Sequence, residues 1–436
     1  MSIDGDRGPA SLLDNGPIGL RFPGLPLDAS ALTLAELGAQ RRPLFGGGFD
    51  FPLMVLRESA VRHNAELMAA FAARGGVSLA PHLKTTCAPE LAGYALRAGA
   101  WGVSVATPFQ ARVFMAAGYE RILLANQVVD PGFAVEAADW ADADPRRDFL
   151  CQVDSPAGVR VLADALRARS GEHPLPVLVE IGHPGGRAGC RDRAALDAVV
   201  QAVREEPALV LAGVSGYEGS VSHSRGHDGL AAVRDYLRWV KSAMDEVLAR
   251  PDPRRHEYVL SAGGSLYFDL VAEELAADLP AGPDTPPVRV ITRPGAYLTH
   301  DQGLYAELSP LDGGGSPPEP LRSAIEVWAP VLSRPAPDLA ILGAGRRELN
   351  FDQGLPTPFE ARDRSGRSAR HGGPEWKVVD LNDHHAFLRL PADAELAPSD
   401  LVRLGISHPC TAHDRWRAVL LVDDDDTVVS VVRCYF

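Results

Sequence analysis

The sequence predicts an α/β fold in which a (β/α)8 barrel is followed by an all-β domain. Between residues 77 and 293, eight short strand-like runs alternate with helix-like segments, as expected of parallel strands joined by helices. The runs are continuously apolar, as in residues 122–125 (ILLA) and 177–179 (VLV), which is typical of strands buried on both faces. After residue 303, strand-like segments follow one another. An open doubly wound sheet is the alternative for the first part.

The expected elements follow in chain order. A strand-like run at 51–57 and a helix with one apolar face at 58–74 come first. The barrel strands are expected at 77–83, 101–106, 121–126, 148–153, 176–182, 210–217, 257–261 and 288–293. The helices between them are expected at 88–99, 108–118, 131–141, 155–169, 192–205, 228–250 and 266–279. The strands of the β-domain are expected at 324–328, 339–342, 376–381, 386–390, 400–406, 416–422 and 427–435.

On this interpretation the chain has three parts. Residues 1–50 form an N-terminal extension that packs on the C-terminal domain. Residues 51–303 form the barrel, and residues 304–436 form the β-domain.

Three polar segments interrupt the apolar pattern of the second half. Residues 311–320 (LDGGGSPPEP) indicate a linker, because Gly and Pro predominate there. Residues 362–374 (RDRSGRSARHGGP) indicate a mobile loop. Asp423–Asp426 is a run of four acids between two apolar strands. A cation site is conceivable there, but we interpret the run as a solvated hairpin turn.

Composition excludes some classes of function. The chain has 436 residues and a net charge of −14, which argues against nucleic acid or an anionic membrane as the partner. No apolar run approaches the ~20 residues of a membrane span. The cysteines are few, scattered and odd in number, which favours a reducing compartment over a disulfide framework. The polar N-terminus lacks a signal peptide's apolar core, so we expect a cytoplasmic protein.

Lys84 is the first candidate for chemistry. Its motif, residues 80–86 (APHLKTT), stands where a strand is expected to end, and barrels place their active sites at that end. The chain has 43 Lys and Arg residues, but only Lys84, Lys241 and Lys377 are lysines. A lysine can form an imine with an aldehyde, whereas a guanidinium is too weak a nucleophile. We expect Lys84 to be functional and the other two lysines to be ordinary surface residues.

Glycine-rich turns follow the later strands of the predicted barrel. Residues 180–187 (EIGHPGGR) place Arg187 after the fifth strand, and residues 216–219 (GYEG) follow the sixth. Residues 261–265 (SAGGS) precede a helix, where free N–H groups and a hydroxyl can bind phosphate. Residues 293–297 (RPGAY) follow the eighth strand. Together with Lys84, these turns predict a phosphorylated aldehyde cofactor, pyridoxal 5′-phosphate, linked to the lysine as an imine.

A candidate metal pair lies near the C-terminus. His408 and Cys410 are two residues apart in SHPC, so on an extended chain both side chains face the same way. Nitrogen and sulfur ligands favour zinc over magnesium or manganese, although manganese remains an alternative. A pair without further Cys or His ligands fits an open catalytic site better than a closed structural one. Asp383 and His385 are possible further site groups. A buried His and Cys with no metal is the simpler reading of the pair.

An ordered set of motifs resembles the fold-type III pyridoxal-phosphate enzymes. The resemblance is to the branch of D-serine dehydratase, D-threonine aldolase and the bacterial amino acid deaminases, and it extends from about Phe51 to Phe436. The motifs are PHLKT, LLANQVV, GYEG, SAGGSLYFD, RPGAYLTHD, LNDHHAFLRL and SHPCTAHDRWR. The resemblance implies an alanine-racemase-like barrel with a β-domain. It also implies a homodimer in which one subunit's barrel meets the other's β-domain at the active site.

The resemblance also implies roles for individual residues. Lys84 matches the lysine that carries the cofactor, and Arg187 matches an arginine near its phenolic oxygen. Tyr217 lies beside the cofactor ring. His408 and Cys410 match the zinc pair of the D-serine dehydratases. The phosphate cradle corresponds to Gly263, Gly264, Ser265, Gly295 and Tyr297.

The sequence departs from the family pattern at two places. Thr86 and Cys87 stand where relatives often have a second histidine, and His413 stands where an apolar aromatic is expected. The aldolases tend to have an acid at the position of Cys410, which favours the dehydratases.

The resulting hypothesis is β-elimination of the hydroxyl of D-serine or D-threonine-type substrates, giving a 2-keto acid and ammonia. Lys84 takes the Cα proton, and zinc on His408 and Cys410 assists the departing hydroxide. D-Threonine aldolase chemistry is the first alternative. An amino acid racemase and a non-catalytic cofactor carrier are the others, but neither explains both the metal pair and the β-domain.

Overall fold

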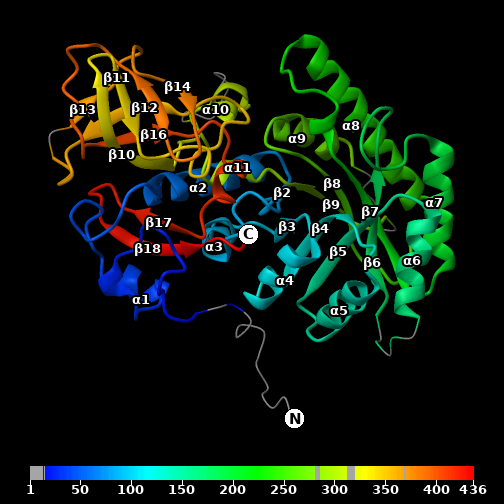
Figure 1. Ribbon diagram of the computed structural model, residues 1–436. Coiled ribbons are helices and arrows are strands. Elements are labelled where there is room, and N and C mark those ends of the chain that lie inside the picture. Colours follow the sequence, from blue (N-terminus) through cyan, green and yellow to red (C-terminus); the bar gives the residue numbers. More distant parts are fainter. Residues whose placement is uncertain are drawn as a thin grey trace. The chain divides into compact units, whose positions relative to one another are not determined.

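A computed structural model describes residues 13, 15–167, 169, 171, 173–279, 285–311, 320–367 and 369–436. The chain forms two compact units (Figure 1). The first contains Met68–Lys84 and Ala95–Gly295, and the second contains Asp14–Leu67, Thr85–Tyr94 and Ala296–Phe436. The chain therefore passes from the first unit to the second directly after Lys84.

The first unit is the predicted barrel. Its strands are β2 (Ser78–Leu79), β3 (Val103–Val105), β4 (Arg121–Gln127), β5 (Asp148–Val153), β6 (Leu175–Ile181), β7 (Leu209–Gly216), β8 (Tyr258–Ala262) and β9 (Val288–Thr292). They pair in parallel in the order β2-β9-β8-β7-β6-β5-β4-β3. Backbone bonds from Leu83 N–H to the Ser104 carbonyl, and from Ser104 N–H to the Pro81 carbonyl, join the two ends of this order. The predicted barrel is confirmed, and the open-sheet alternative is wrong.

Helices lie around the outside of the strands (Figure 1). They include α4 (Pro108–Ala116), α5 (Pro131–Asp142), α6 (Pro156–Leu166), α7 (Arg193–Glu205), α8 (His227–Leu248) and α9 (Phe268–Ala276). The helices α2 (Glu58–Arg74) and α3 (Pro89–Arg97) are divided between the two units, and Ala60, Val61 and Leu91 pack in the core of the second. The side chains of Thr107, Asp130 and Ser155 cap α4, α5 and α6, each just before a proline at the first helical position. These caps satisfy N–H groups that would otherwise be unpaired, so each crossover begins at a defined residue.

Small and branched apolar side chains fill the barrel interior. One cluster comprises Ala80, Leu123, Leu150, Leu178, Ala212, Val259 and Ile291. These residues come from the β2 segment and from β4 to β9, which makes the interior a packed core and leaves chemistry to the carboxyl ends of the strands.

The second unit is built on a mostly antiparallel sheet. Its strands are β1 (Leu53–Arg57), β10 (Ile325–Ala336), β11 (Leu339–Leu342), β12 (Thr357–Arg362), β13 (Arg370–His371), β14 (Lys377–Leu381), β15 (Ala386–Arg389), β16 (Leu401–Gly405), β17 (Ala418–Val422) and β18 (Val428–Arg433). The main order is β13-β12-β16-β10-β1-β17-β18, and β11, β15 and β14 continue from the far end of β10. This confirms the predicted all-β domain.

The strand β1 is a central strand of this second sheet. It pairs antiparallel with β10, with Leu53 opposite Trp328, and parallel with β17. Residues 53–56 are all buried, which explains why this run is continuously apolar although it is not a strand of the barrel. The sequence placed this run at the start of the barrel segment.

Residues near the N-terminus contribute to the core of the second unit. The helix α1 (Leu34–Ala39) begins at a capping box formed by Thr33 and Glu36. The short helix η2 (Leu27–Ala29) precedes it. Buried side chains from Ile18 to Phe49 pack in one cluster with side chains of β1, β17 and β18.

Two of the predicted polar segments have different outcomes. Residues 362–374 are not simply a loop, because β13 pairs there with β12. Neither strand shows an apolar alternation, so the sequence did not reveal them. The predicted linker 311–320 lies outside the described residues except at its ends.

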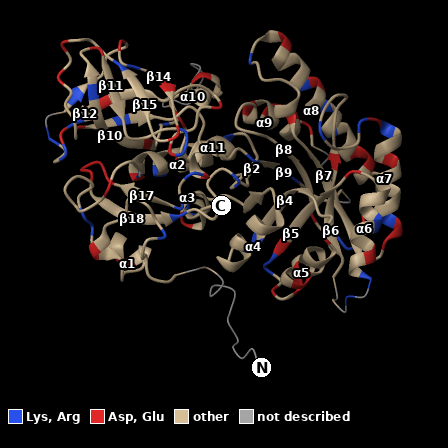
Figure 2. Cartoon of the chain, in the orientation of Figure 1, with Lys and Arg blue, Asp and Glu red and all other residues tan. Residues whose placement is uncertain are grey.

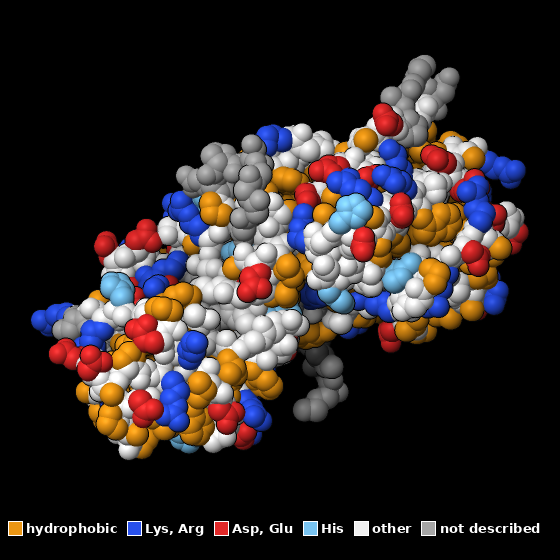
Figure 3. All heavy atoms as spheres, turned by 90° about the horizontal axis from the view of Figure 1, so that it is seen from above, with side chains coloured by type: hydrophobic (Ala, Val, Ile, Leu, Met, Phe, Trp, Pro, Cys, Tyr) orange, Lys and Arg blue, Asp and Glu red, His pale blue; other side chains and the backbone are white. Residues whose placement is uncertain are grey.

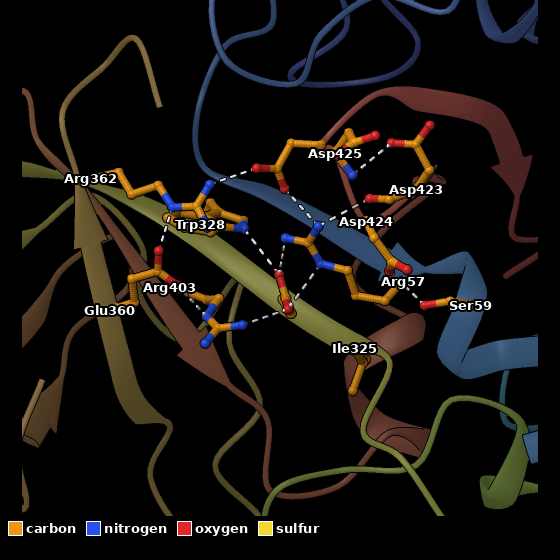
Figure 4. Close-up of polar contacts among 12 residues, drawn as sticks. Arg57, Ser59, Ile325, Trp328, Glu360, Arg362, Arg403, Asp423, Asp424 and Asp425 are labelled. Atoms are coloured by element: carbon orange, nitrogen blue, oxygen red, sulfur yellow. Dashed lines mark hydrogen bonds and ion pairs between the residues drawn. The ribbon is translucent and has the colours of Figure 1, made fainter. Parts of the chain in front are cut away.

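The four-acid run is a hairpin turn between β17 and β18, but it is not simply solvated (Figure 4). Asp426 forms ion pairs with Arg57 and Arg362, each at 2.6 Å. Asp423 accepts the N–H groups of Asp425 and Thr427, which shapes the turn. Arg57 also pairs with Glu326 on β10 at 3.1 Å, so the hairpin joins a network that crosses the sheet.

Charged residues of both signs occur along the outer helices of the barrel, notably α6, α7 and α8 (Figure 2). The face shown in Figure 3 also mixes acidic, basic and apolar side chains. Within the described residues, no helix combines the length and apolarity needed to cross a bilayer. All five cysteines are free thiols.

Candidate cofactor and metal sites

The lysine loop leaves the barrel at the carboxyl end of β2. His82 forms an isolated bridge with Ser104, and the next residues carry the exposed Lys84 out of the strand. A Cβ atom at Gly295 would collide with the His82 carbonyl oxygen, so only glycine allows the two loops this approach. The loops after β2 and β9 are therefore neighbours, as the sequence predicted for one end of the barrel.

His82 lies among three cationic side chains. Burial and the positive charges of Lys84, Arg293 and Arg187 lower its pKa well below the usual value. Its ring is therefore neutral at physiological pH. The buried Nδ1 atom has no hydrogen-bond partner among the described residues.

Arg187 and Tyr217 come together as the resemblance implies. The guanidinium carbon of Arg187 lies 4.8 Å from the centre of the Tyr217 ring, in a cation–π arrangement. Tyr217 follows β7, and its N–H donates to the hydroxyl of Tyr236 at 2.9 Å. An aromatic ring and a planar cation thus stand at the same end of the barrel as Lys84.

The Gly-Gly turn after β8 is occupied by a carboxylate. Glu218 is completely buried and accepts the N–H groups of Gly263 and Gly264 at 2.8 and 2.7 Å. Burial raises the pKa of Glu218, and the two amides oppose that effect. The sequence predicted these N–H groups to be free for a phosphate. In the structure they already bind an anionic group of the chain itself.

A buried arginine lies beneath this turn. Arg293 donates to the hydroxyls of Ser215 and Ser261 and, at 2.6 Å, to the Gly216 carbonyl. Burial lowers its pKa, whereas the carboxylates of Glu218 and Glu180 raise it. Its Nε atom has no hydrogen-bond partner among the described residues.

These residues fit a pyridoxal-phosphate cofactor. Buried polar atoms without partners among the described residues gather at this end of the barrel: His82 Nδ1, Thr292 Oγ1 and Arg293 Nε. Such atoms are costly unless a polar ligand satisfies them. Lys84 and Arg187 add cations suited to an anionic ligand. Ser265 and Gly295 remain predicted phosphate contacts.

The His–Cys pair lies after β16, and its geometry differs from the expected extended chain. Pro409 adopts an αR conformation (φ −70°, ψ −28°), and Cys410 begins the one-turn helix α11 (Cys410–His413). The turn still keeps the two side chains close enough to interact electrostatically, because Cys410 raises the pKa of His408. The proline fixes φ and thus favours this turn.

Both members of the pair have further partners. The Nδ1–H of His408 donates to Asp352 Oδ2 at 2.7 Å, and the Thr411 hydroxyl donates to Asp352 Oδ1 at 2.6 Å. The Thr85 hydroxyl lies 3.1 Å from the Cys410 sulfur. Burial lowers the pKa of His408, but Cys410 and Asp352 outweigh it and raise the value to about 9.

The pair can hold a divalent cation through soft nitrogen and sulfur donors. No group of three or more His, Cys, Asp or Glu side chains suited to a metal occurs in the described part of the chain. Two protein ligands leave the other coordination positions of a zinc ion to solvent or substrate, as in catalytic sites.

The remaining predicted residues belong to the second unit. Asp383 and His385 are exposed at the turn between β14 and β15, and Asp383 pairs with Arg347 at 3.3 Å. Tyr297, in the short helix η4 (Ala296–Leu298) of the second unit, is buried, and its hydroxyl has no partner among the described residues.

Sequence reasoning assigned no role to Glu218, His82, Arg293, Thr85 or Asp352. The first four stand inside motifs that the sequence singled out, so a closer reading could have marked them. Asp352 is not part of any motif that the sequence singled out, and it hydrogen-bonds to His408 although the two are 56 residues apart in the sequence.

Comparison with known proteins agrees with both units. Residues 56–266 match the family model "Alanine racemase, N-terminal domain", and residues 324–422 match the model "Putative serine dehydratase domain".

Individual relatives cover most of the chain. A D-threonine aldolase from Arthrobacter sp. is 29% identical over 82% of this chain and 85% of its own. A D-threonine aldolase structure from Filomicrobium marinum is 24% identical with a TM-score of 0.74, covering 90% of this chain and 97% of that one. The D-threo-3-hydroxyaspartate dehydratase of Delftia sp. HT23 is 22% identical with a TM-score of 0.70, covering 91% and 100%. The chain thus belongs to the fold-type III pyridoxal-phosphate family, with an alanine racemase N-terminal domain followed by a D-serine dehydratase-like domain.

Proposed function

We propose that this protein is a pyridoxal-phosphate- and zinc-dependent lyase that removes the hydroxyl group of D-serine or D-threonine-type substrates. The products are a 2-keto acid and ammonia. The observation that carries the proposal is the pairing of His408 with a cysteine, Cys410, in a turn that brings both donors together.

The dehydratase relative supports this choice. Its solved structures include a cysteine-to-alanine variant in the metal-free form and a variant in which the histidine two positions earlier is replaced by alanine. His408 and Cys410 have the same order and spacing. The aldolases of this branch tend to have an acid at the second position.

Lys84 is the residue we assign to proton transfer. Its amine would hold the cofactor and accept the Cα proton at Nζ. The bound cofactor supplies an electron sink for the charge left on the substrate carbon. Arg187 and Tyr217 would position the ring, because they already stack on each other at 4.8 Å. The neutral His82 leaves the positive charge near Lys84 to Arg187 and Arg293.

His408 and Cys410 would hold the zinc ion. Zinc supplies a Lewis acid for the β-hydroxyl, whose hydroxide is a poor leaving group near neutral pH. Asp352 fixes the His408 ring through Nδ1, which leaves Nε2 available to the metal. We further propose that the protein is cytoplasmic and forms a homodimer; light scattering of the purified protein tests the dimer, and cell fractionation tests the location.

The second candidate is D-threonine aldolase chemistry, in which the Cα–Cβ bond breaks. The Arthrobacter relative favours it, because it is 29% identical over 363 residues. The same lysine and metal pair would serve this reaction.

The decisive experiment is product analysis with D-serine and D-threonine, before and after treatment with a chelator. We expect chelator-sensitive release of keto acid and ammonia. If D-threonine gives glycine and acetaldehyde, the protein is an aldolase and the dehydratase proposal is wrong. Undiminished activity after complete metal removal would contradict both.

A further inference from the structure

We propose that Thr85 and Asp352 are positioning residues that set the zinc affinity of the His408–Cys410 pair. This inference rests on the metal half of the proposed function. It adds that two neighbouring residues, each in contact with one of the two ligands, determine the affinity for the ion.

Asp352 acts on the histidine. It accepts the Nδ1–H of His408 at 2.7 Å, which fixes the tautomer with Nε2 as the free donor and also fixes the orientation of the ring. Two further donors hold the carboxylate: the Thr411 hydroxyl at 2.6 Å and the Asn350 amide at 3.3 Å. Asn350 also donates to the Ser407 hydroxyl at 3.1 Å, next to His408. The carboxylate is therefore oriented before a metal binds.

Thr85 acts on the cysteine. Its hydroxyl lies 3.1 Å from the Cys410 sulfur, and its side chain is 1% exposed, so water does not compete for this contact. A buried neighbour in contact with a ligand atom fixes the orientation in which that atom meets the metal. The same contact restricts the rotation of the Cys410 side chain and so keeps the sulfur beside His408.

Thr85 also follows Lys84 directly in the sequence. The residue that holds one metal ligand is thus joined by a peptide bond to the residue we assign to cofactor binding.

The neighbouring Thr86 provides a matched control. Thr86 is equally buried, at 0% exposed, but its hydroxyl has no hydrogen-bond partner among the described residues. Thr85→Val and Thr86→Val remove the same atom from adjacent buried positions. Any difference between them reports the contact with Cys410.

The first measurement is zinc affinity, obtained from metal-depleted protein by competition with a coloured chelator. We expect Thr85→Val to bind zinc about 10-fold more weakly than the native protein, whereas Thr85→Ser and Thr86→Val should stay within about threefold. A second readout uses cobalt in place of zinc. The thiolate-to-cobalt charge-transfer band should shift in Thr85→Val and return in Thr85→Ser.

Asp352 is tested in the same way. Asp352→Asn should weaken zinc binding by about 10-fold or more, because the amide no longer offers a charged acceptor to His408. The control is Asp414→Asn, because Asp414 is an exposed acid near the pair and does not hydrogen-bond to His408. Thermal unfolding of each metal-free variant identifies any that fold poorly.

The outcomes separate the two proposals. Native protein that binds zinc, with Thr85→Val equal to Thr86→Val and Asp352→Asn equal to Asp414→Asn, would overturn this inference and leave the proposed function intact. If the native protein binds no more zinc than the His408→Ala variant, the metal half of the proposed function is overturned, and this inference with it.

Discussion

The end of the barrel that carries Lys84 and the turn that carries His408 and Cys410 differ in how far their polar groups are satisfied. In the barrel, His82 Nδ1 and Arg293 Nε are buried without partners among the described residues. At the turn, His408 bonds to Asp352 at 2.7 Å, and Cys410 lies 3.1 Å from the Thr85 hydroxyl.

This difference indicates that the two sites are prepared for different kinds of ligand. Unsatisfied buried polar atoms destabilise a protein until a ligand completes them. The barrel end is therefore suited to a large polar cofactor that supplies several hydrogen bonds at once. The turn needs only a single ion, because its donors are already oriented by neighbours.

The largest expected effect comes from Lys84, which tests the barrel half of the comparison. Lys84→Ala should abolish the yellow absorption of the lysine-linked cofactor and reduce turnover by roughly 10³-fold or more, because it removes both attachment and proton transfer. Absorption spectra and turnover of the purified variant measure this. The control is Lys241→Ala, whose amine donates to the Ala277 carbonyl and should leave both quantities unchanged.

Glu218 is the exception within the barrel, because it satisfies two backbone amides that the cofactor could otherwise use. Glu218→Ala leaves the N–H groups of Gly263 and Gly264 without their acceptor, so we expect cofactor-free protein to lose about 2–4 kcal/mol of unfolding free energy. Glu218→Gln keeps one acceptor and should lose about half as much. Urea unfolding measures both values. A stable Glu218→Ala would mean that these amides do not depend on the carboxylate.

The comparison also shows what the sequence could and could not predict. The eight barrel strands were predictable, because strands buried on both faces are continuous apolar runs such as 122–125. The strands β12 and β13 were not, because their charged side chains are satisfied only in the folded sheet, as with Arg362 and Asp426.

At the sites the same limit applies. Lys84 and the His-x-Cys spacing are local signals, and the sequence contains them in full. The partners depend on contacts between distant positions: Glu218 lies 45 residues from Gly263, and Asp352 lies 56 residues from His408. Amides that look free in a Gly-Gly turn can thus be bound by a carboxylate that no local pattern reveals.

His413 is an exception in the β-domain, because it is a buried polar residue with few hydrogen-bond partners. It is completely buried, its Nε2 has no partner among the described residues, and its Nδ1 lies 4.0 Å from the Cys434 sulfur. Burial lowers its pKa to about 3, below the ordinary value of 6.5. Unfolded protein therefore takes up a proton here as the pH falls from about 6.5 towards 3, and folded protein does not.

Stability should accordingly be lost across that pH range. The contribution of His413 is complete above pH 6.5, and it should fall by about 3 kcal/mol at pH 4. His413→Phe should flatten this part of the stability curve while changing little at pH 7. Urea unfolding of metal-depleted protein at both pH values measures the difference. Equal acid sensitivity in the native protein and the variant would mean that other groups cause it.

The smallest effect is expected at Asp426, where charges are well satisfied but partly exposed. Its carboxylate pairs with Arg57 and Arg362, each at 2.6 Å, while 18% of its side chain is exposed (Figure 4). Asp426 has a positive φ of 58°, which Asn tolerates as well as Asp, so Asp426→Asn removes the charge with little backbone strain. We expect a loss of about 1–2 kcal/mol, below that of a fully buried pair, because solvent screens both arginines.

The neighbouring acid decides whether this loss reflects pairing or the hairpin itself. Asp425 is exposed in the same turn, and its carboxylate forms no ion pair with any described residue, so Asp425→Asn should change the unfolding free energy by no more than about 0.5 kcal/mol. Equal losses in the two variants would show that charge in the turn matters and the ion pairs do not. A loss confined to Asp426→Asn would show that ion-paired charges stabilise the β-domain. The buried polar atoms at the barrel end, which lack hydrogen-bond partners among the described residues, make no such contribution.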